Sequence, residues 1–126
     1  MAASKDGRAA AHTTSAGLKP RHYFILLSLS GGDRHGLAIA RDVDELSDGQ
    51  LHLWPATLYG SLDELCQHAW IEEIDDARGR PSDESEKKRF YRLTRTGRGV
   101  LASETARLAE LVRVAKARIK HAGESL

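Results

Sequence analysis

An amphipathic helix followed directly by a β-hairpin with a long, charged tip is the feature that most restricts how this chain can fold. The helix is expected from Pro55, a residue suited to a first helical turn, to about residue 69. Its apolar stripe consists of Leu58, Leu62, Leu65 and Ala69. Residues 71–75 and 89–94 alternate between apolar and polar side chains, which predicts two paired strands around the polar segment 76–88. This order of elements is typical of a winged helix-turn-helix.

Two further helices are expected before the Pro55 helix. The first begins at Pro20 and ends at Ser30-Gly31-Gly32, because glycine commonly follows the end of a helix. Its apolar residues are Phe24, Ile25, Leu27 and Leu29. The second is capped by Asp33 and runs to about Ser47, with inward-facing side chains expected at Leu37, Ala40, Val43 and either Ile39 or Leu46. A short extended piece, Leu51-His52-Leu53, follows it.

The expected fold class is therefore mainly α with a small β-hairpin: a winged helix-turn-helix plus a long C-terminal helix. The 126 residues are enough for one compact domain. We expect a disordered tail over residues 1–17, which have little to bury, a winged-helix domain over 18–95 and a C-terminal dimerisation helix over 96–122.

Composition excludes several classes of protein. Cys66 is the single cysteine, so an internal disulfide and a cysteine-based zinc site are ruled out. The six histidines form no helical pair that could hold a metal. No apolar run approaches the ~20 residues of a membrane-spanning helix and no secretory signal is recognisable, which favours a cytoplasmic protein without membrane contact. No nucleophile, base and orienting group can be assembled, so we expect neither an enzyme nor a cofactor.

The polar face of the Pro55 helix suits contact with double-stranded DNA. Thr57, Gly60 and Ser61 are small and neutral, so the first two helical turns can come close to a major groove. The free N–H groups at the helix start can bind phosphate oxygens, and the Tyr59 hydroxyl can reach one too. His35, at the start of the preceding helix, is a further candidate for a phosphate contact. The alternative is an ordinary solvated helix face on which Tyr59 only fills space.

The hairpin concentrates positive charge that the chain as a whole lacks. Residues 78–95 include seven basic and three acidic side chains, whereas the whole chain carries a net charge of +1. Basic side chains on a wing can lie along the DNA backbone and supply affinity that does not depend on sequence. The candidates for this role are Arg80, Lys87, Lys88 and Arg89. The alternative is a long exposed loop that is merely charged.

The last helix carries an apolar seam with alternating steps of four and three residues. The seam consists of Leu101, Thr105, Leu108, Val112, Ala115 and Ile119. A helix of about 26 residues is ~39 Å long, more than a small three-helix core can cover. The simplest partner for its far half is the same helix of a second subunit, which would place two Pro55 helices near one DNA turn apart, ~34 Å. The alternative is a helix folded back on its own domain with a frayed end.

Three short motifs resemble the PadR family of bacterial transcriptional regulators. His35-Gly36-Leu37-Ala38-Ile39 is similar to the opening of that family's second helix. Pro55-Ala56-Thr57-Leu58-Tyr59 is similar to the start of its recognition helix, and 90–98, Phe-Tyr-Arg-Leu-Thr-Arg-Thr-Gly-Arg, to its wing exit. The resemblance covers about residues 20–120, in order. Trp54 departs from it, because a polar capping residue usually precedes the proline.

The resemblance implies a homodimeric regulator, usually a repressor, that binds an inverted-repeat operator. It also implies that Thr57, Tyr59, Ser61 and basic wing residues contact DNA, and that the first and last helices form the dimer. The interface residues expected on this basis are Phe24, Leu27, Leu101, Leu108, Leu111, Val112, Ala115 and Ile119. Some short members bind flat aromatic effectors through aromatic residues of the last helix. No aromatic residue follows Tyr91 here, so no effector is assigned.

Some assignments stay open at this stage. Trp54 and Trp70 are interpreted as packing residues at the edge of the core, with an effector pocket as the alternative for Trp54. Cys66 is interpreted as a small core residue. The alternative function for the whole chain is a winged-helix module that binds another protein rather than DNA.

Overall fold

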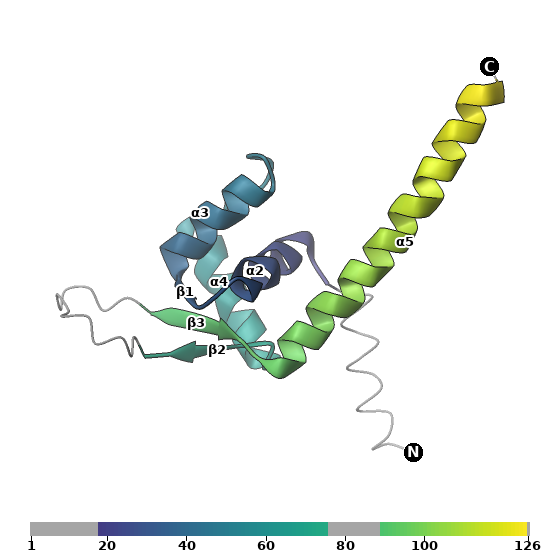
Figure 1. The fold of residues 1–126 in the computed structure, drawn as a ribbon. Coiled ribbons are helices and arrows are strands. Elements are labelled where there is room, and N and C mark those ends of the chain that lie inside the picture. The colour runs from purple at the N-terminus through teal and green to yellow at the C-terminus, as the bar shows by residue number, and fades with distance from the viewer. Residues whose placement is uncertain (1–17, 76–88, 126) are drawn as a thin grey trace, which may run out of the picture.

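A computed structural model describes residues 18–75 and 89–125 of the chain. Its elements, in chain order, are α2 (Pro20–Ser30), β1 (Arg34–His35), α3 (Gly36–Leu46), α4 (Pro55–Gln67), β2 (Ile71–Ile74), β3 (Phe90–Leu93) and α5 (Arg95–Ser125). Helices α2, α3 and α4 pack together beside a small antiparallel sheet, and α5 extends away from this domain (Figure 1). The strand order is β1-β3-β2. The expected fold class is confirmed, with a third strand added to the hairpin.

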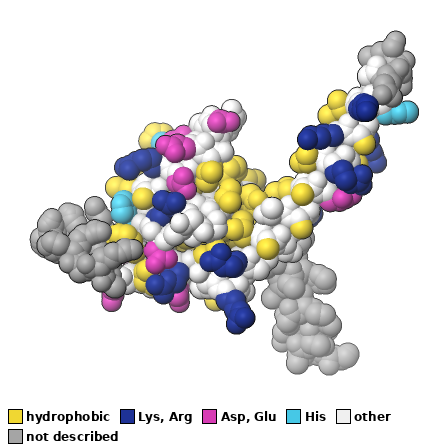
Figure 2. Space-filling model, viewed as in Figure 1, with side chains coloured by type: hydrophobic (Ala, Val, Ile, Leu, Met, Phe, Trp, Pro, Cys, Tyr) yellow, Lys and Arg dark blue, Asp and Glu magenta, His cyan; other side chains and the backbone are white. Residues whose placement is uncertain are grey.

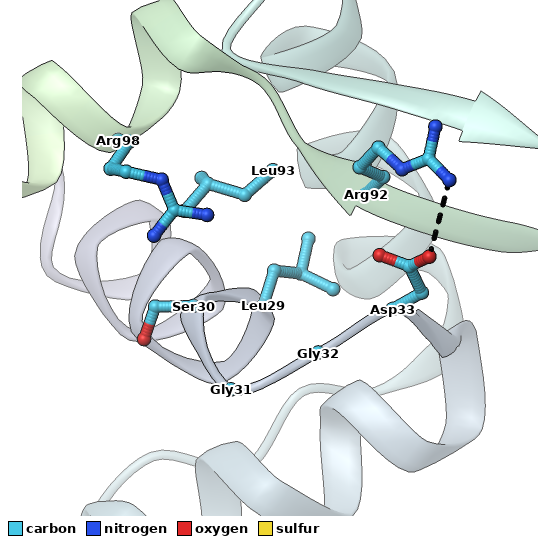
Figure 3. Close-up of a pocket in the computed structure, with 8 residues that line it drawn as sticks. All are labelled: Leu29, Ser30, Gly31, Gly32, Asp33, Arg92, Leu93 and Arg98. Atoms are coloured by element: carbon cyan, nitrogen blue, oxygen red, sulfur yellow. Dashed lines mark hydrogen bonds and ion pairs between the residues drawn. The ribbon is translucent and has the colours of Figure 1, made fainter.

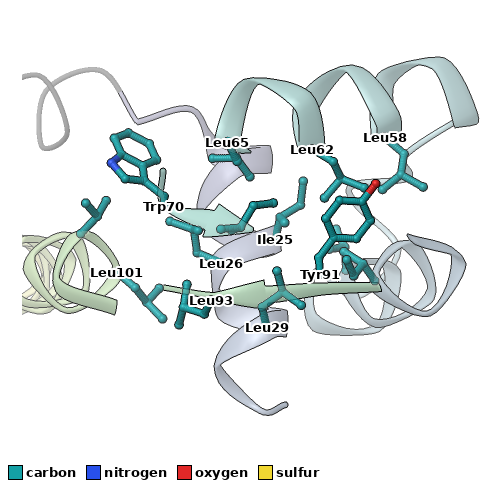
Figure 4. Close-up of a cluster of buried hydrophobic side chains, with 14 of the residues drawn as sticks. Ile25, Leu26, Leu29, Leu58, Leu62, Leu65, Trp70, Tyr91, Leu93 and Leu101 are labelled. Carbon is teal, nitrogen blue, oxygen red and sulfur yellow. The ribbon is translucent and has the colours of Figure 1, made fainter. Parts of the chain in front are cut away.

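Helix α2 lies at the centre of the core and packs against α3, α4, α5 and β3. Ile25 and Leu26 are completely buried. The buried apolar side chains around them are Leu29, Ile39, Val43, Leu53, Leu58, Leu62, Leu65, Trp70, Ile71, Tyr91, Leu93, Val100 and Leu101 (Figure 4). Phe24 and Leu27, which the periodicity of this helix also made candidates for the core, are only half-buried and pack against its edge.

Helix α3 begins two residues later than expected, and its cap is not Asp33. The Nδ1 atom of His35 accepts a hydrogen bond from the Ala38 N–H at 3.3 Å and caps the helix, whereas Asp33 pairs with Arg92 at 3.4 Å. The residues before the helix form β1 and pair with β3. The prediction for the inward face is correct for Val43 and wrong for Leu37, which is exposed. Of the two alternatives, Ile39 is buried and Leu46 is exposed.

The piece expected to be extended, Leu51-His52-Leu53, forms no strand. The Leu51 N–H donates to the Ser47 hydroxyl at 2.9 Å, so this backbone is bonded locally rather than to the sheet. Leu53 is buried and anchors the segment to the core. The first strand of the sheet is therefore β1, which precedes α3.

Helix α4 ends at Gln67 because Ala69 adopts a left-handed conformation, with φ at 63°. The Trp70 N–H donates to the Leu65 carbonyl at 3.1 Å and the Ala69 N–H to the Cys66 carbonyl at 2.9 Å, which is the pattern of a Schellman motif. This turn leads the chain straight into β2, where Ile71 faces Leu93 of β3.

Thr94 joins the sheet to α5 with three hydrogen bonds. Its N–H donates to the Trp70 carbonyl at 3.0 Å and its hydroxyl to the Ala69 carbonyl at 2.7 Å. The same hydroxyl oxygen accepts from the Gly97 N–H at 3.0 Å and so caps α5. Gly97 lies so close to the Trp70 carbonyl that a Cβ atom at this position would overlap it. The Thr-x-x-Gly spacing thus fixes where α5 leaves the domain.

Only the first turns of α5 belong to the core. Val100, Leu101 and Glu104 are buried, Leu108 is half-buried, and from 109 to 123 every side chain except half-buried Val114 is exposed. The assignment of Leu101 to a subunit interface is therefore wrong, because this side chain packs inside its own domain at 8% exposure. None of the helices in the described part of the chain combines the length and apolar character of a membrane span.

Substitution of Gly97 tests the close contact at this junction. Gly97→Ala is expected to lower the free energy of unfolding by roughly 2–3 kcal/mol, because the added methyl group displaces the Trp70 carbonyl. Gly99→Ala is the matched control: nothing lies within 4 Å of its Cβ position, and alanine should stabilise the helix by about 0.5–1 kcal/mol. Chemical denaturation measures both, and equal effects of the two substitutions would contradict the proposed overlap.

Candidate nucleic-acid interface

The first half of α4 presents a small, uncharged surface. Thr57 and Gly60 are exposed, while Leu58 and Leu62 on the opposite side are buried. No acidic residue occurs in the first turn, and the side chain of Trp54 makes no capping hydrogen bond. The backbone N–H groups at the helix start and the positive end of its dipole are thus left to an anion.

Ser61 does not lie on this surface, so the predicted exposure of its side chain is wrong. It is 2% exposed, and its hydroxyl accepts a hydrogen bond from Arg21 Nε of α2 at 2.9 Å. Leu58, Ser61 and Leu65 follow one another at helical spacing, so Ser61 falls on the buried stripe. Its hydroxyl joins α4 to α2.

Glu64 also turns toward α2. Its carboxylate lies 3.0 Å from His22 Nε2 and 3.9 Å from Lys19 Nζ. Burial lowers the pKa of His22, and the Glu64 charge raises it again in part. The negative charge of Glu64 is therefore paired with side chains at the start of α2. Asp63, which the sequence analysis missed, is the acidic residue on the exposed side, one turn beyond Gly60; the helical spacing from Gly60 could have revealed it.

Tyr59 packs across the start of α3. A Cβ atom on Gly36 would lie 2.5 Å from the Tyr59 hydroxyl oxygen, so glycine is required for the ring to lie there. The ring is half-buried, and the guanidinium of Arg89 lies 6.0 Å from its centre. The His-Gly and Thr-Leu-Tyr motifs of the sequence thus meet in one contact, which orients α4 relative to α3.

Arg89 is exposed at the base of the wing and is already paired. Its Nε and Nη2 atoms donate to the Glu73 carboxylate at 3.2 and 3.3 Å, which raises the pKa of the guanidinium. The same guanidinium lies 6.0 Å from the ring of Tyr91. Arg89 is thus held beside Tyr59 on the α4 side of the sheet. Of the other basic residues predicted for the wing, Arg80, Lys87 and Lys88 lie outside the described residues.

His35 has a structural role that its sequence position did not reveal. Besides capping α3, its ring packs edge-on against Phe90 of β3 at 5.5 Å between centres. If His35 contacts a phosphate as predicted, it does so with a ring whose orientation is already set by Ala38 and Phe90.

The Cys66 thiol and the Tyr91 hydroxyl, which lie next to this surface, are both uncharged near neutral pH. Burial raises the pKa of the Cys66 thiol, and the charges of Glu73 and Asp63 raise it further, so the thiol stays protonated near neutral pH. Burial also raises the pKa of Tyr91 to about 12. These shifts agree with the interpretation of Cys66 as a packing residue.

A pocket of about 280 Å³ lies between the end of α2 and the junction of β3 with α5 (Figure 3). It is lined by Leu29, Ser30, Gly31, Gly32, Asp33, Arg92, Leu93 and Arg98. Arg92 pairs with Asp33 and, at 3.7 Å, with Glu72. The carbonyl groups at the end of α2 add negative partial charge to the pocket. The positive charges of Arg92 and Arg98 are therefore offset by groups of this chain, and we assign no cofactor to the pocket. Within 18–75 and 89–125, no cluster of metal-binding side chains occurs.

The sequence matches the model of the transcriptional regulator PadR-like family over residues 25–103, more than half of the chain. The chain belongs to the PadR-like family. The family resemblance of the three short motifs is thereby confirmed. As a PadR-like protein, the chain is a transcriptional regulator and not an enzyme.

Solved structures, two of them named as PadR proteins, have the same fold. A PadR family transcription regulator from Clostridium difficile R20291 is 19% identical, with 80% of this chain and 99% of that chain covered and a TM-score of 0.67. RosR from H. salinarum is also 19% identical, with coverages of 89% and 99% and a TM-score of 0.60. Bacillus subtilis PadR in complex with operator DNA is 23% identical, with coverages of 64% and 44% and a TM-score of 0.53. A search of curated proteins found no match.

The burial of His22, which lowers the pKa of its imidazole, predicts how the stability of this PadR-like protein depends on pH. The folded pKa of His22 lies below its ordinary value of 6.5, so the unfolded chain takes up this proton first as the pH falls. The contribution of His22 to stability is therefore complete above pH 6.5 and decreases below it. Denaturation of the wild type and of His22→Gln at several pH values measures it. The variant should lose less stability than the wild type on acidification. An identical pH dependence of the two proteins would contradict the conclusion that His22 is buried and neutral.

Proposed function

We propose that this PadR-like regulator binds double-stranded DNA with the start of α4 in the major groove. The observation that carries this proposal is the exposed, uncharged surface of Thr57 and Gly60 at a helix start without a side-chain cap. Phosphate oxygens fit such a helix start, and small side chains allow close approach to base edges. Bacillus subtilis PadR, which shares this fold, was solved in complex with operator DNA, and this supports DNA binding by the present chain.

The charges around α4 favour insertion of its first two turns. Glu64 is paired with His22 and Lys19, which offsets its negative charge. Asp63 is exposed and would repel phosphates if the helix entered more deeply. We therefore infer that the groove is contacted by Thr57, Gly60 and Tyr59. Arg89 and the predicted wing residues Arg80, Lys87 and Lys88 hold the flanking backbone.

We infer that the regulator is a homodimer formed through α5. The helix has 31 residues and is about 46 Å long, of which only the first few turns pack on the domain. Leu111, Val112 and Ile119 are exposed on the protruding part, Ile119 to 70%. Figure 2 shows hydrophobic side chains interspersed with basic ones along this part of the helix. An isolated helical segment of this length is marginal in water, so a second copy of α5 is its simplest support. The apolar residues of the seam that remain for the dimer are Leu108, Val112, Ala115 and Ile119. Exposed Leu111 of α5 and half-buried Phe24 and Leu27 of α2 complete the predicted interface.

A two-fold symmetric dimer implies an inverted-repeat operator. Its two copies of α4 would enter major grooves about one helical turn apart, ~34 Å. A protein bound in this way covers both half-sites, and we infer that it acts as a repressor by excluding other proteins from the operator. Such a role agrees with the cytoplasmic location expected from the sequence.

A single charge at the start of α4 tests the DNA-binding surface. Thr57→Glu should keep or raise stability, because an acidic side chain suits a first helical turn, yet weaken duplex binding by more than about tenfold through repulsion of phosphates. Gln67→Glu makes the same change of charge at the exposed far end of α4 and is the control. Fluorescence anisotropy at about 50 and 200 mM salt measures binding. Equal affinities of the two variants would contradict the proposed surface, and salt-independent binding would favour a protein-interaction role.

A charge on the exposed seam tests the dimer. Val112→Glu should convert dimers into monomers without unfolding the domain, because Val112 is 50% exposed in the single chain and makes no part of its core. Ala117→Glu, on the opposite side of α5, is also exposed and should leave the dimer intact. Sedimentation equilibrium distinguishes the two outcomes. A wild-type protein that sediments as a monomer would rule out the seam altogether.

A further inference from the structure

Trp54 is exposed although its size and apolar character suit a protein interior. It is 68% exposed, whereas Trp70, the other tryptophan, is 7% exposed and stacks on His68. The interpretation of Trp54 as a packing residue at the core edge is therefore wrong. Tryptophan is enriched at interfaces, because its indole combines an apolar face with an N–H donor.

The indole of Trp54 is held in place by neighbouring side chains. Its ring meets the ring of His52 edge-on, with 4.4 Å between centres. His52 in turn is fixed by Asp44 of α3, whose Oδ2 atom lies 2.9 Å from His52 Nδ1. The indole thus projects from the domain in a defined orientation beside the start of α4.

Trp54 also occupies a position where another residue would stabilise the fold. It is the N-cap of α4, where serine, threonine, aspartate or asparagine would bond a free backbone N–H group. Tryptophan makes no such bond here. A residue that forgoes a local stabilising bond and exposes apolar surface is typical of a functional site.

We propose that Trp54 is part of the DNA interface and packs against the sugar–phosphate backbone at the edge of the groove. The proposal rests on the proposed function, because Trp54 directly precedes Pro55 and is exposed together with the first residues of α4, Thr57 among them. The flat ring covers apolar sugar carbons while Nε1–H donates to a phosphate oxygen, a combination that the amphipathic indole provides. Such a contact adds affinity for any duplex sequence.

Trp54→Ser distinguishes the structural role of Trp54 from its role in binding, because it should raise the stability of the protein and lower its affinity for DNA. Serine supplies the missing cap, so the Tm should rise by roughly 2–6 °C. Affinity for a mixed-sequence duplex of about 30 base pairs should fall about tenfold, or about 1.4 kcal/mol. Trp54→Phe keeps an aromatic ring but loses the N–H donor, so its affinity for the duplex should lie between those of the wild type and Trp54→Ser. Wild-type affinity in Trp54→Ser would overturn the proposal.

The fluorescence of the two tryptophans gives an independent test. Addition of the same duplex should protect wild-type emission from acrylamide quenching, because Trp54 becomes covered. In Trp54→Phe the remaining emission comes from buried Trp70, and the duplex should not change its quenching. Unchanged quenching in the wild type, or protection of Trp54 in the DNA-free protein by a second copy, would contradict the proposal. If the wild type binds no duplex even at low salt, the proposed function itself fails.

Discussion

The burial of α2 among the other elements is the interaction on which the rest of the structure depends. Ile25 and Leu26 have no exposed surface, and this helix contacts α3, α4, α5 and β3. Its polar side chains then set how α4 is turned: Arg21 bonds Ser61 and His22 bonds Glu64. These two contacts hold the later part of α4 against α2, whereas Thr57 and Gly60, which lie nearer the start of the helix, are left to solvent.

The sequence predicted the helices and the hairpin because proline, glycine and apolar spacing act locally. Pro20 and Pro55 begin their helices as expected, and strands appear within 71–75 and 89–94. The exposed face of α4 was predicted less well, because Ser61 looks like a surface residue in the sequence and the partner that satisfies its buried hydroxyl, Arg21, is 40 residues away. Likewise, Asp33 resembled a helix cap, yet its bond to Arg92, 59 residues away, depends on how the sheet meets α2.

The short motifs that indicated the family are explained by two close backbone contacts. Gly36 leaves room for the Tyr59 ring, and Gly97 leaves room for the Trp70 carbonyl. The first contact sets the angle between α3 and α4, and the second sets the direction of α5. Neither contact could be predicted from periodicity, because each joins residues that are more than 20 positions apart.

Three successive residues of α2 connect the two ends of the molecule. Arg21 and His22 bond α4, while the Tyr23 hydroxyl lies 2.8 Å from the Thr105 hydroxyl of α5. In the proposed dimer, a rotation of α5 would therefore move α2 and α4 together as one rigid body. Because α5 is long, a small change in the angle between the two subunits would produce a large change in the distance between their α4 helices. Geometry at the subunit contact would then govern which half-site spacing the regulator accepts.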